Sequence, residues 1–169
     1  MVFRVTPVYT YTFSLHFHKY RADTTGGGTR GGVSVFIRNC YTSTSMAKFS
    51  VCHAYYEISV VKVLLSNNCT VIIIGVYRPQ DKSKIPEFTI KLNQILSSTS
   101  QSDHVFIVGN LNINLPDPIA MENDFINKCH SNSFIPLTNK PTRNAHNNPS
   151  ILDHIWTNQL YGTFNGIFY

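Results

Sequence analysis

Residues 104–114 read HVFIVGNLNIN, and this stretch decides more about the fold than any other in the chain. Its first part, 104–109, has the apolar and β-branched content of a short buried strand. Asn110 and Asn112 follow at once, and their spacing puts both side chains on one side of an extended chain. Asn and Gly also favour turns, so a simple turn is the alternative interpretation. A strand that delivers polar side chains to its carboxyl end predicts a functional site there.

The residues upstream predict further strands. Residues 55–65 (YYEISVVKVLL) and 70–77 (TVIIIGVY) are rich in β-branched and apolar residues, and an Asn-Asn pair lies between them. This pattern predicts an antiparallel hairpin. Residues 33–38 (VSVFIR) alternate with the period of a strand. If the sheet lacks its covering strands, the β-branched run 71–74 becomes an aggregation hazard.

Two helices and two further strands are expected outside residues 104–114. Pro86 can open a helix, and the apolar stripe that follows it has helical spacing: Phe88, Leu92, Ile95 and Leu96. A second helix is predicted from Met121, Phe125 and Cys129, and residues 151–156 (ILDHIW) and 166–169 predict strands. Strands therefore dominate the first half and helices intervene later, which favours an α+β layered sandwich.

Composition narrows the function without deciding it. The chain has 169 residues, a formal net charge of +5 and a pI of about 9.1. A mild basic surplus suits a polyanion such as DNA or RNA, and ordinary surface charge is the equal alternative. The cysteines form no C-x-x-C pair, so a zinc site is not expected. No window of 18 apolar residues exists, so no membrane span is expected.

Several short motifs occur in a fixed order along the chain: GGVSVFIRN at 31–39, GVYRP at 75–79, GNLN at 109–112, PTR at 141–143 and SILDHI at 150–155. This succession resembles the endonuclease/exonuclease/phosphatase superfamily, and the first motif resembles its non-LTR retrotransposon branch. The resemblance covers about residues 20–169. It implies a single partial domain over 1–169, with a DNase I-like, four-layer αββα sandwich that is incomplete at its N- and C-terminal edges.

The resemblance implies a role for each matching residue. Tyr77 matches a tyrosine that contacts the scissile phosphate, Asn112 an asparagine that helps hold the attacking water, and Asp153 an aspartate that orients the catalytic histidine. Substrate-side positions are implied for three further residues: Arg78, Arg143 and Ser150. The implied chemistry is Mg²⁺-assisted, in-line hydrolysis of a phosphodiester in DNA. We expect Tyr77, Asn110, Asn112 and Asp153 to surround one cleft at the same end of the sandwich.

The sequence departs from the family pattern at the residue that activates the attacking water. Asn110 stands where the family has an aspartate, and an amide cannot accept a proton near neutral pH. The metal-binding glutamate has no counterpart, because Glu57 matches an ordinary strand position. Mg²⁺ binding is therefore not expected to follow the family. The family's terminal S-D-H motif is expected beyond Tyr169.

These departures predict a fragmentary and inactive copy of a retrotransposon endonuclease domain. One alternative is a non-catalytic remnant that still binds nucleic acid without sequence preference. Another is a phosphatase of the same superfamily, and a third is a product with no function. The residues do not choose between the remnant and the functionless product.

Overall fold

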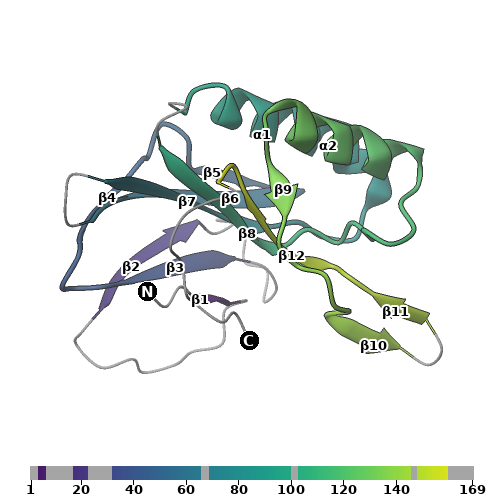
Figure 1. The fold of residues 1–169 in the computed structure, drawn as a ribbon, viewed down its shortest axis with the longest axis horizontal. Helices are drawn as coiled ribbons and strands as arrows, with labels where there is room; N and C mark the ends of the chain where they lie inside the picture. Colours follow the sequence, from purple (N-terminus) through teal and green to yellow (C-terminus); the bar gives the residue numbers. More distant parts are fainter. Residues whose placement is uncertain are drawn as a thin grey trace.

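The computed structural model describes residues 4–6, 17–22, 32–65, 69–99, 103–145 and 148–159. Within them, two helices lie side by side over one face of a large sheet, and a smaller sheet covers its other face (Figure 1). The smaller sheet has the order β1-β3-β2, with bounds β1 Arg4–Thr6, β2 Phe17–Ala22 and β3 Val33–Arg38.

The large sheet has the order β4-β6-β7-β8-β12-β9, and β5 also pairs with β6. Its bounds are β4 Thr42–Ser45, β5 Val51–His53, β6 Tyr56–Leu64, β7 Thr70–Tyr77, β8 His104–Asn110, β9 Ile135–Pro136 and β12 Asp153–Thr157. β6 and β7 form the predicted antiparallel hairpin, while β7 and β8 run parallel. A separate hairpin of β10 Arg143–Ala145 and β11 Asn148–Ser150 projects from the body (Figure 1).

The two helices connect the strands of the large sheet. The turn η2 (Lys82–Lys84) leads into α1 (Ile85–Leu96), which returns the chain from β7 to β8, as a parallel strand pair requires. Pro86 lies in the first turn of α1, where its missing N–H is not needed. α2 (Ala120–Ser131) packs beside α1 and leads towards β9. Neither helix among the described residues combines the length and apolar character needed to cross a membrane.

The core has two compartments, because neighbouring residues of a strand face opposite sides of the sheet. On β7, Ile72, Ile74 and Val76 face the helices. Val71 and Ile73 face the smaller sheet and pack there with residues of β3 and β6. All five side chains are buried, so the run 71–74 lies in the middle of the sheet with both faces covered. The covering layers whose absence would expose this run are therefore present in the described structure, and the aggregation hazard stays a prediction.

The α+β sandwich predicted from the sequence is confirmed. The described residues supply three of the four expected layers: the helices α1 and α2, the large sheet and the smaller sheet. A helical layer outside the smaller sheet is not among the described residues. The strand predicted at 166–169 also lies outside them. The strand predicted at 151–156 begins two residues later, at Asp153, because residues 151–152 belong to the loop that precedes β12.

Gly109 allows β7 and β8 to approach each other closely at the end of the sheet. Its φ is +148°, in a region that side chains rarely adopt, and a Cβ built there would lie 1.9 Å from the carbonyl oxygen of Val76. The atoms that such a Cβ would meet belong to the main chain of Val76, so a change of side-chain rotamer cannot relieve the clash. By contrast, Gly75 has no disfavoured φ, and a Cβ there would meet Cγ2 of Val35 at 2.8 Å, which is a side chain and not backbone.

We predict that Gly109→Ala lowers the free energy of unfolding by about 2 kcal/mol or more, because it combines a disfavoured φ with a backbone clash. Chemical denaturation of the native and variant chains measures the change. Gly75→Ala is the matched control and should cost less, because Gly75 lacks the disfavoured φ and the sub-3 Å backbone clash of Gly109. Equal stability of the native chain and Gly109→Ala would contradict the close approach of the two strands.

Candidate active site

Four polar residues form one row across the end of the large sheet. Glu57 pairs with Tyr77, Tyr77 pairs with Asn110, and Asn110 pairs with Asp153, each on the next strand. Each lies in phase with the residues of its strand that face the smaller sheet, so the four side chains share that face. The row places three of the predicted site residues next to one another although they are far apart in the sequence.

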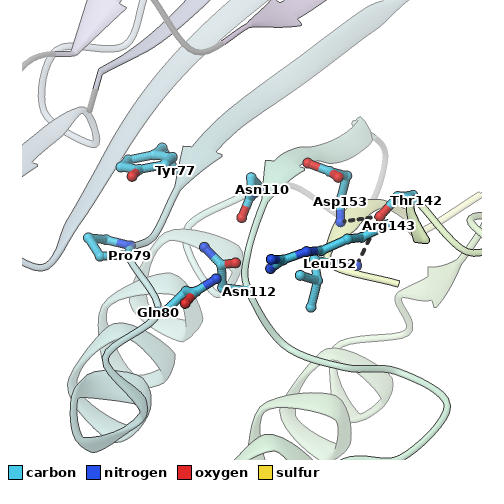
Figure 2. Close-up of a pocket in the computed structure, with 9 residues that line it drawn as sticks. All are labelled: Tyr77, Pro79, Gln80, Asn110, Asn112, Thr142, Arg143, Leu152 and Asp153. Atoms are coloured by element: carbon cyan, nitrogen blue, oxygen red, sulfur yellow. Dashed lines mark hydrogen bonds between the residues drawn. The ribbon is translucent and has the colours of Figure 1, made fainter. Parts of the chain in front are cut away.

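A pocket of about 450 Å³ opens at this end of the sheet. Tyr77, Asn110, Asn112, Arg143 and Asp153 line it, so the structure brings together the four residues that were expected around one cleft and adds Arg143 (Figure 2). Four further residues complete the lining: Pro79, Gln80, Thr142 and Leu152. The pocket is thus built from the ends of β7, β8 and β12 and from the start of the β10–β11 hairpin.

Arg78 is at odds with the substrate contact expected of it. Its side chain has no exposed surface, and its guanidinium donates to the backbone carbonyls of Leu111, Asp81 and Asn112 at 2.8, 2.8 and 2.9 Å. A phosphate in the pocket therefore cannot reach it, and Arg78 acts on the backbone instead. The expected substrate contact of Arg78 was wrong because the motif places this residue near the pocket but does not reveal the direction of its side chain.

Ser150 also lies away from the substrate position expected of it. It pairs with Arg143 across the β10–β11 hairpin, and its carbonyl oxygen accepts a hydrogen bond from the Thr142 N–H at 3.0 Å. Ser150 is not among the residues that line the pocket. Its contacts keep Arg143 and Thr142 in place, which is an indirect contribution.

Asn110 presents an unpartnered oxygen to the pocket. Its Oδ1 is buried and has no hydrogen-bond partner among the described residues, while its carbonyl oxygen accepts the Arg78 N–H at 3.0 Å. Buried polar atoms are usually hydrogen-bonded, so this oxygen is suited to a donor on a ligand or water. As an amide oxygen it can accept a hydrogen bond but cannot take up a proton as a general base.

Thr142 positions Asp153, a role that the sequence interpretation missed. Its Oγ1 accepts the N–H groups of Leu152 and Asp153 at 3.0 and 3.1 Å (Figure 2). These bonds fix the start of β12, from which the exposed Asp153 side chain faces the pocket. The PTR motif contained the signal, since Thr142 is its central residue, but only Arg143 was singled out. Gln80, also missed, follows the tyrosine motif and is exposed at the pocket.

His154 supports the loops beneath the pocket from the other face of β12. It is buried, and its Nε2 lies 2.8 Å from the Ile113 carbonyl and 3.2 Å from the Ile151 carbonyl. Its Nδ1 accepts the indole N–H of Trp156 at 3.1 Å. Together these partners require a neutral ring with the proton on Nε2. Burial lowers the pKa of His154 from its ordinary value of 6.5, although the two carbonyls oppose the shift.

The pocket does not fit the Mg²⁺ ion that the family resemblance implies. Mg²⁺ is usually held through one or two carboxylates and other oxygens. Among the described residues, Asp153 is the only carboxylate that lines the pocket. The carboxylate of Glu57 instead accepts the N–H of Gly32. No three His, Cys, Asp or Glu side chains among the described residues are grouped to hold a metal ion.

Comparison of the structure with solved structures shows which fold this is. The endonuclease domain of TRAS1, a telomere-specific non-LTR retrotransposon, matches with a TM-score of 0.68 and 12% identity over 83% of this chain and 64% of that one. An endonuclease/exonuclease/phosphatase family protein from Leptotrichia buccalis matches with a TM-score of 0.59 and 13% identity, over 87% and 61%. D. rerio TDP2 complexed with a single-strand DNA product matches with a TM-score of 0.56 and 11% identity, over 85% and 62%.

The chain therefore has the fold of the endonuclease/exonuclease/phosphatase superfamily, which confirms the resemblance found in the sequence motifs at the level of the fold. It spans less than two thirds of the length of each of these three structures. No family model matches the sequence, and no curated protein sequence matches it significantly.

We predict that the stability of the chain falls as the pH drops below about 6.5, partly through His154. A lowered pKa in the folded protein means that the unfolded chain binds the proton first, so stability is present above 6.5 and lost below it. This residue contributes up to about 1.4 kcal/mol per pH unit. His154→Gln keeps a donor and an acceptor but does not titrate, so its denaturation curves should depend less on pH. The same pH dependence in both proteins would refute this role.

Proposed function

We propose that the pocket binds a phosphate of a DNA backbone, as part of an endonuclease domain of the non-LTR retrotransposon type. The observation that carries this proposal is the convergence of Tyr77, Asn110, Asn112 and Arg143 on one pocket at the end of a sheet with this fold. The Tyr77 phenol can donate a hydrogen bond to a phosphate oxygen, and the Arg143 guanidinium can bond two such oxygens at once. The motif order of the sequence and the TRAS1 endonuclease domain support the retrotransposon branch.

Arg143 is the cation that we assign to the phosphate. It is exposed, begins β10, and extends into the pocket towards Asn112 (Figure 2). Arg78, by contrast, is fully engaged by backbone carbonyls and contributes no direct contact. Of the two arginines that were expected to contact substrate, only Arg143 is therefore assigned to the phosphate. The net charge of +5 adds a general attraction to a polyanion.

We further propose that the site binds DNA without hydrolysing it efficiently. An in-line attack by water needs a base, and the residue in the position of the family's aspartate is the amide of Asn110. General base catalysis contributes about 10²–10⁴-fold to such reactions. The same substitution removes a negative charge from the pocket, which favours an incoming phosphate. Asn110 therefore favours the binding of DNA and disfavours its cleavage.

We predict that the chain binds a short fluorescent DNA duplex at about 50 mM salt and loses affinity steeply towards 200 mM, because phosphate contacts release counterions. Arg143→Ala should weaken binding and reduce the salt slope by about one. Asn110→Asp should also weaken it, because it adds a negative charge beside the phosphate. Fluorescence anisotropy measures all three proteins.

Arg38→Ala is the matched control for that experiment. Arg38 is exposed and is the last residue of β3. The opposite end of β3 lies near the pocket, because the N–H of Gly32, just before β3, contacts Glu57 in the row beside the pocket. Its loss removes the same charge from a different place, so affinity should change little. If Arg143→Ala and Arg38→Ala behave alike, or if the native chain does not bind, the pocket is not a DNA site.

We predict that the purified chain does not nick supercoiled plasmid in Mg²⁺ or Mn²⁺ above the buffer background, because Asn110 cannot act as the base. Gel electrophoresis of relaxed and supercoiled plasmid measures nicking. Metal-dependent nicking that co-purifies with the protein and disappears in Asn112→Ala would show that the site is active. It would overturn the separation of binding from cleavage while leaving the DNA assignment intact.

A further inference from the structure

The strongest unexplained feature of the molecule is the buried arginine behind the pocket. Arg78 follows β7 directly, and its N–H and guanidinium donate to four backbone carbonyls, three of which belong to consecutive residues: Asn110, Leu111 and Asn112. The fourth is that of Asp81, before η2. One side chain therefore joins the end of β7, the end of β8 and the approach to α1.

Asn112 returns the contact. Its Nδ2 donates to the carbonyl oxygen of Arg78 at 2.6 Å, while the Arg78 guanidinium donates to the carbonyl oxygen of Asn112 at 2.9 Å. Each residue thus holds the main chain of the other with its side chain. The exchange commits the amide nitrogen of Asn112 and so fixes the rotation of the amide that lines the pocket.

The backbone at Asn112 is in a conformation that needs support. Its φ is +51°, in the left-handed region that non-glycine residues seldom adopt, although Asn tolerates it better than most. Such a residue persists where the surroundings determine its conformation. On one side of the turn, Arg78 and Asn112 exchange the two hydrogen bonds described above, and we call this pair of contacts the Arg78 clamp. On the other side, the Leu152 carbonyl accepts the N–H groups of Leu111 and Asn112 at 2.9 and 3.3 Å.

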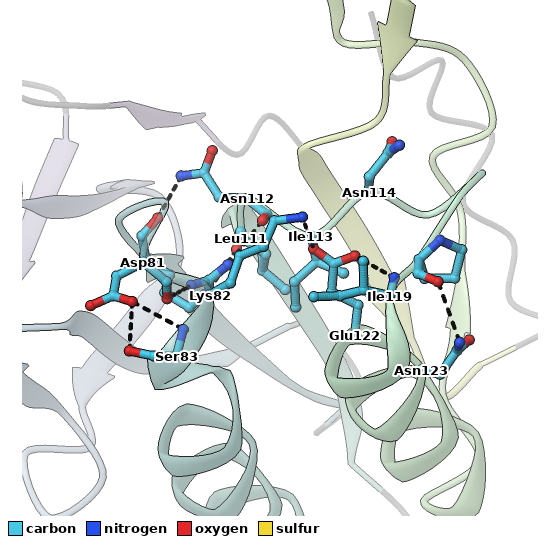
Figure 3. A network of polar contacts seen from close by, with 12 residues as sticks. Asp81, Lys82, Ser83, Leu111, Asn112, Ile113, Asn114, Ile119, Glu122 and Asn123 are labelled. Carbon is cyan, nitrogen blue, oxygen red and sulfur yellow. Dashed lines mark hydrogen bonds and ion pairs between the residues drawn. The ribbon is translucent and has the colours of Figure 1, made fainter.

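The charge of Arg78 is balanced within the same network. Burial of a guanidinium is costly unless it is paired and hydrogen-bonded. Burial lowers the pKa of Arg78, and the carboxylates of Glu122 and Asp81 oppose that shift. Glu122 is itself buried, accepts the Ile119 N–H at 2.8 Å and lies 3.5 Å from the Lys82 ammonium (Figure 3). The ion pair between Glu122 and Lys82 therefore connects the first turn of α2 to the turn η2.

We propose that Arg78 is a positioning residue, whose guanidinium holds the 110–112 turn and so fixes the wall of the phosphate pocket that Asn110 and Asn112 line. This inference rests on the proposed function, because it assigns to Arg78 the preparation of the same phosphate site. Arg78 touches no ligand and acts through the backbone of the turn. Lysine cannot replace it, because a single ammonium lacks the planar fork that reaches several carbonyls at once.

The first test is residue-resolved hydrogen exchange by NMR on the full chain, for native protein and Arg78→Lys. The N–H groups of Leu111 and Asn112 should exchange about tenfold faster or more in the variant, because the turn opens locally. The N–H of Ile107, in the middle of β8, should change little. Equal acceleration at all three positions would mean that Arg78 supports only the stability of the whole domain, and would overturn the proposal.

A second variant keeps the test decisive if Arg78→Lys does not fold. Asn112→Asp has nearly the same shape but replaces the Nδ2 donor with an oxygen that repels the Arg78 carbonyl. It should produce the same local pattern, with faster exchange at Leu111 and residue 112 and little change at Ile107. Unchanged exchange at Leu111 would show that the reciprocal contact does not hold the turn.

The second test connects the clamp to DNA. On the folded protein, Arg78→Lys should weaken binding of the duplex about tenfold although the net charge is unchanged, and the salt slope should stay that of the native chain. Arg143→Ala should reduce that slope by about one. A reduced slope in Arg78→Lys would reveal a direct phosphate contact, and unchanged affinity would deny a positioning role. If the native chain binds no duplex, the proposed function fails, while the exchange pattern still decides whether Arg78 holds the turn.

Discussion

β7 and β8 run parallel, and the whole site depends on that pairing. Because the chain returns through α1 before β8 begins, both strands end at the same edge of the large sheet. Tyr77 and Asn110 therefore become neighbours, although 33 residues separate them in the sequence. Gly109 lets the two strands approach to a distance that a side chain would prevent. β12 then adds Asp153 on the other side of Asn110 and completes the pocket wall.

The two arginines near the pocket illustrate how burial assigns different tasks to the same side chain. Arg78 is buried and its guanidinium donates to carbonyls of the main chain, so it determines the shape of the 110–112 turn. Arg143 stands on an exposed hairpin and keeps its guanidinium available to a ligand. The buried charge is tolerable because Glu122 shares the network and because the donors are satisfied. The exposed charge needs no such partner.

Asn110 changes what the pocket can do without changing its architecture. An aspartate and an asparagine have nearly the same size, so the strand, the turn and the row of side chains can stay as they are. The amide keeps an oxygen that accepts hydrogen bonds, and this oxygen faces the pocket without a partner among the described residues. Compared with the aspartate that the family resemblance implies at this position, the amide has neither basicity nor negative charge. On the proposed function, this favours retention of a phosphate over its hydrolysis.

The sequence by itself predicted the hairpin of β6 and β7, the two helices, the strands β3, β8 and β12 and the α+β class, while the family resemblance of its motifs implied that Tyr77, Asn110, Asn112 and Asp153 surround one cleft. The elements could be predicted because hydrophobic periodicity reflects local chain geometry, whereas the cleft followed from the resemblance to the family. Only the tertiary structure decided the direction of each side chain around the pocket. In the structure Arg78 is buried, Ser150 pairs within the β10–β11 hairpin and does not line the pocket, and Thr142 and Gln80 do line it. Such outcomes depend on contacts between strands distant in the sequence, which no local pattern encodes.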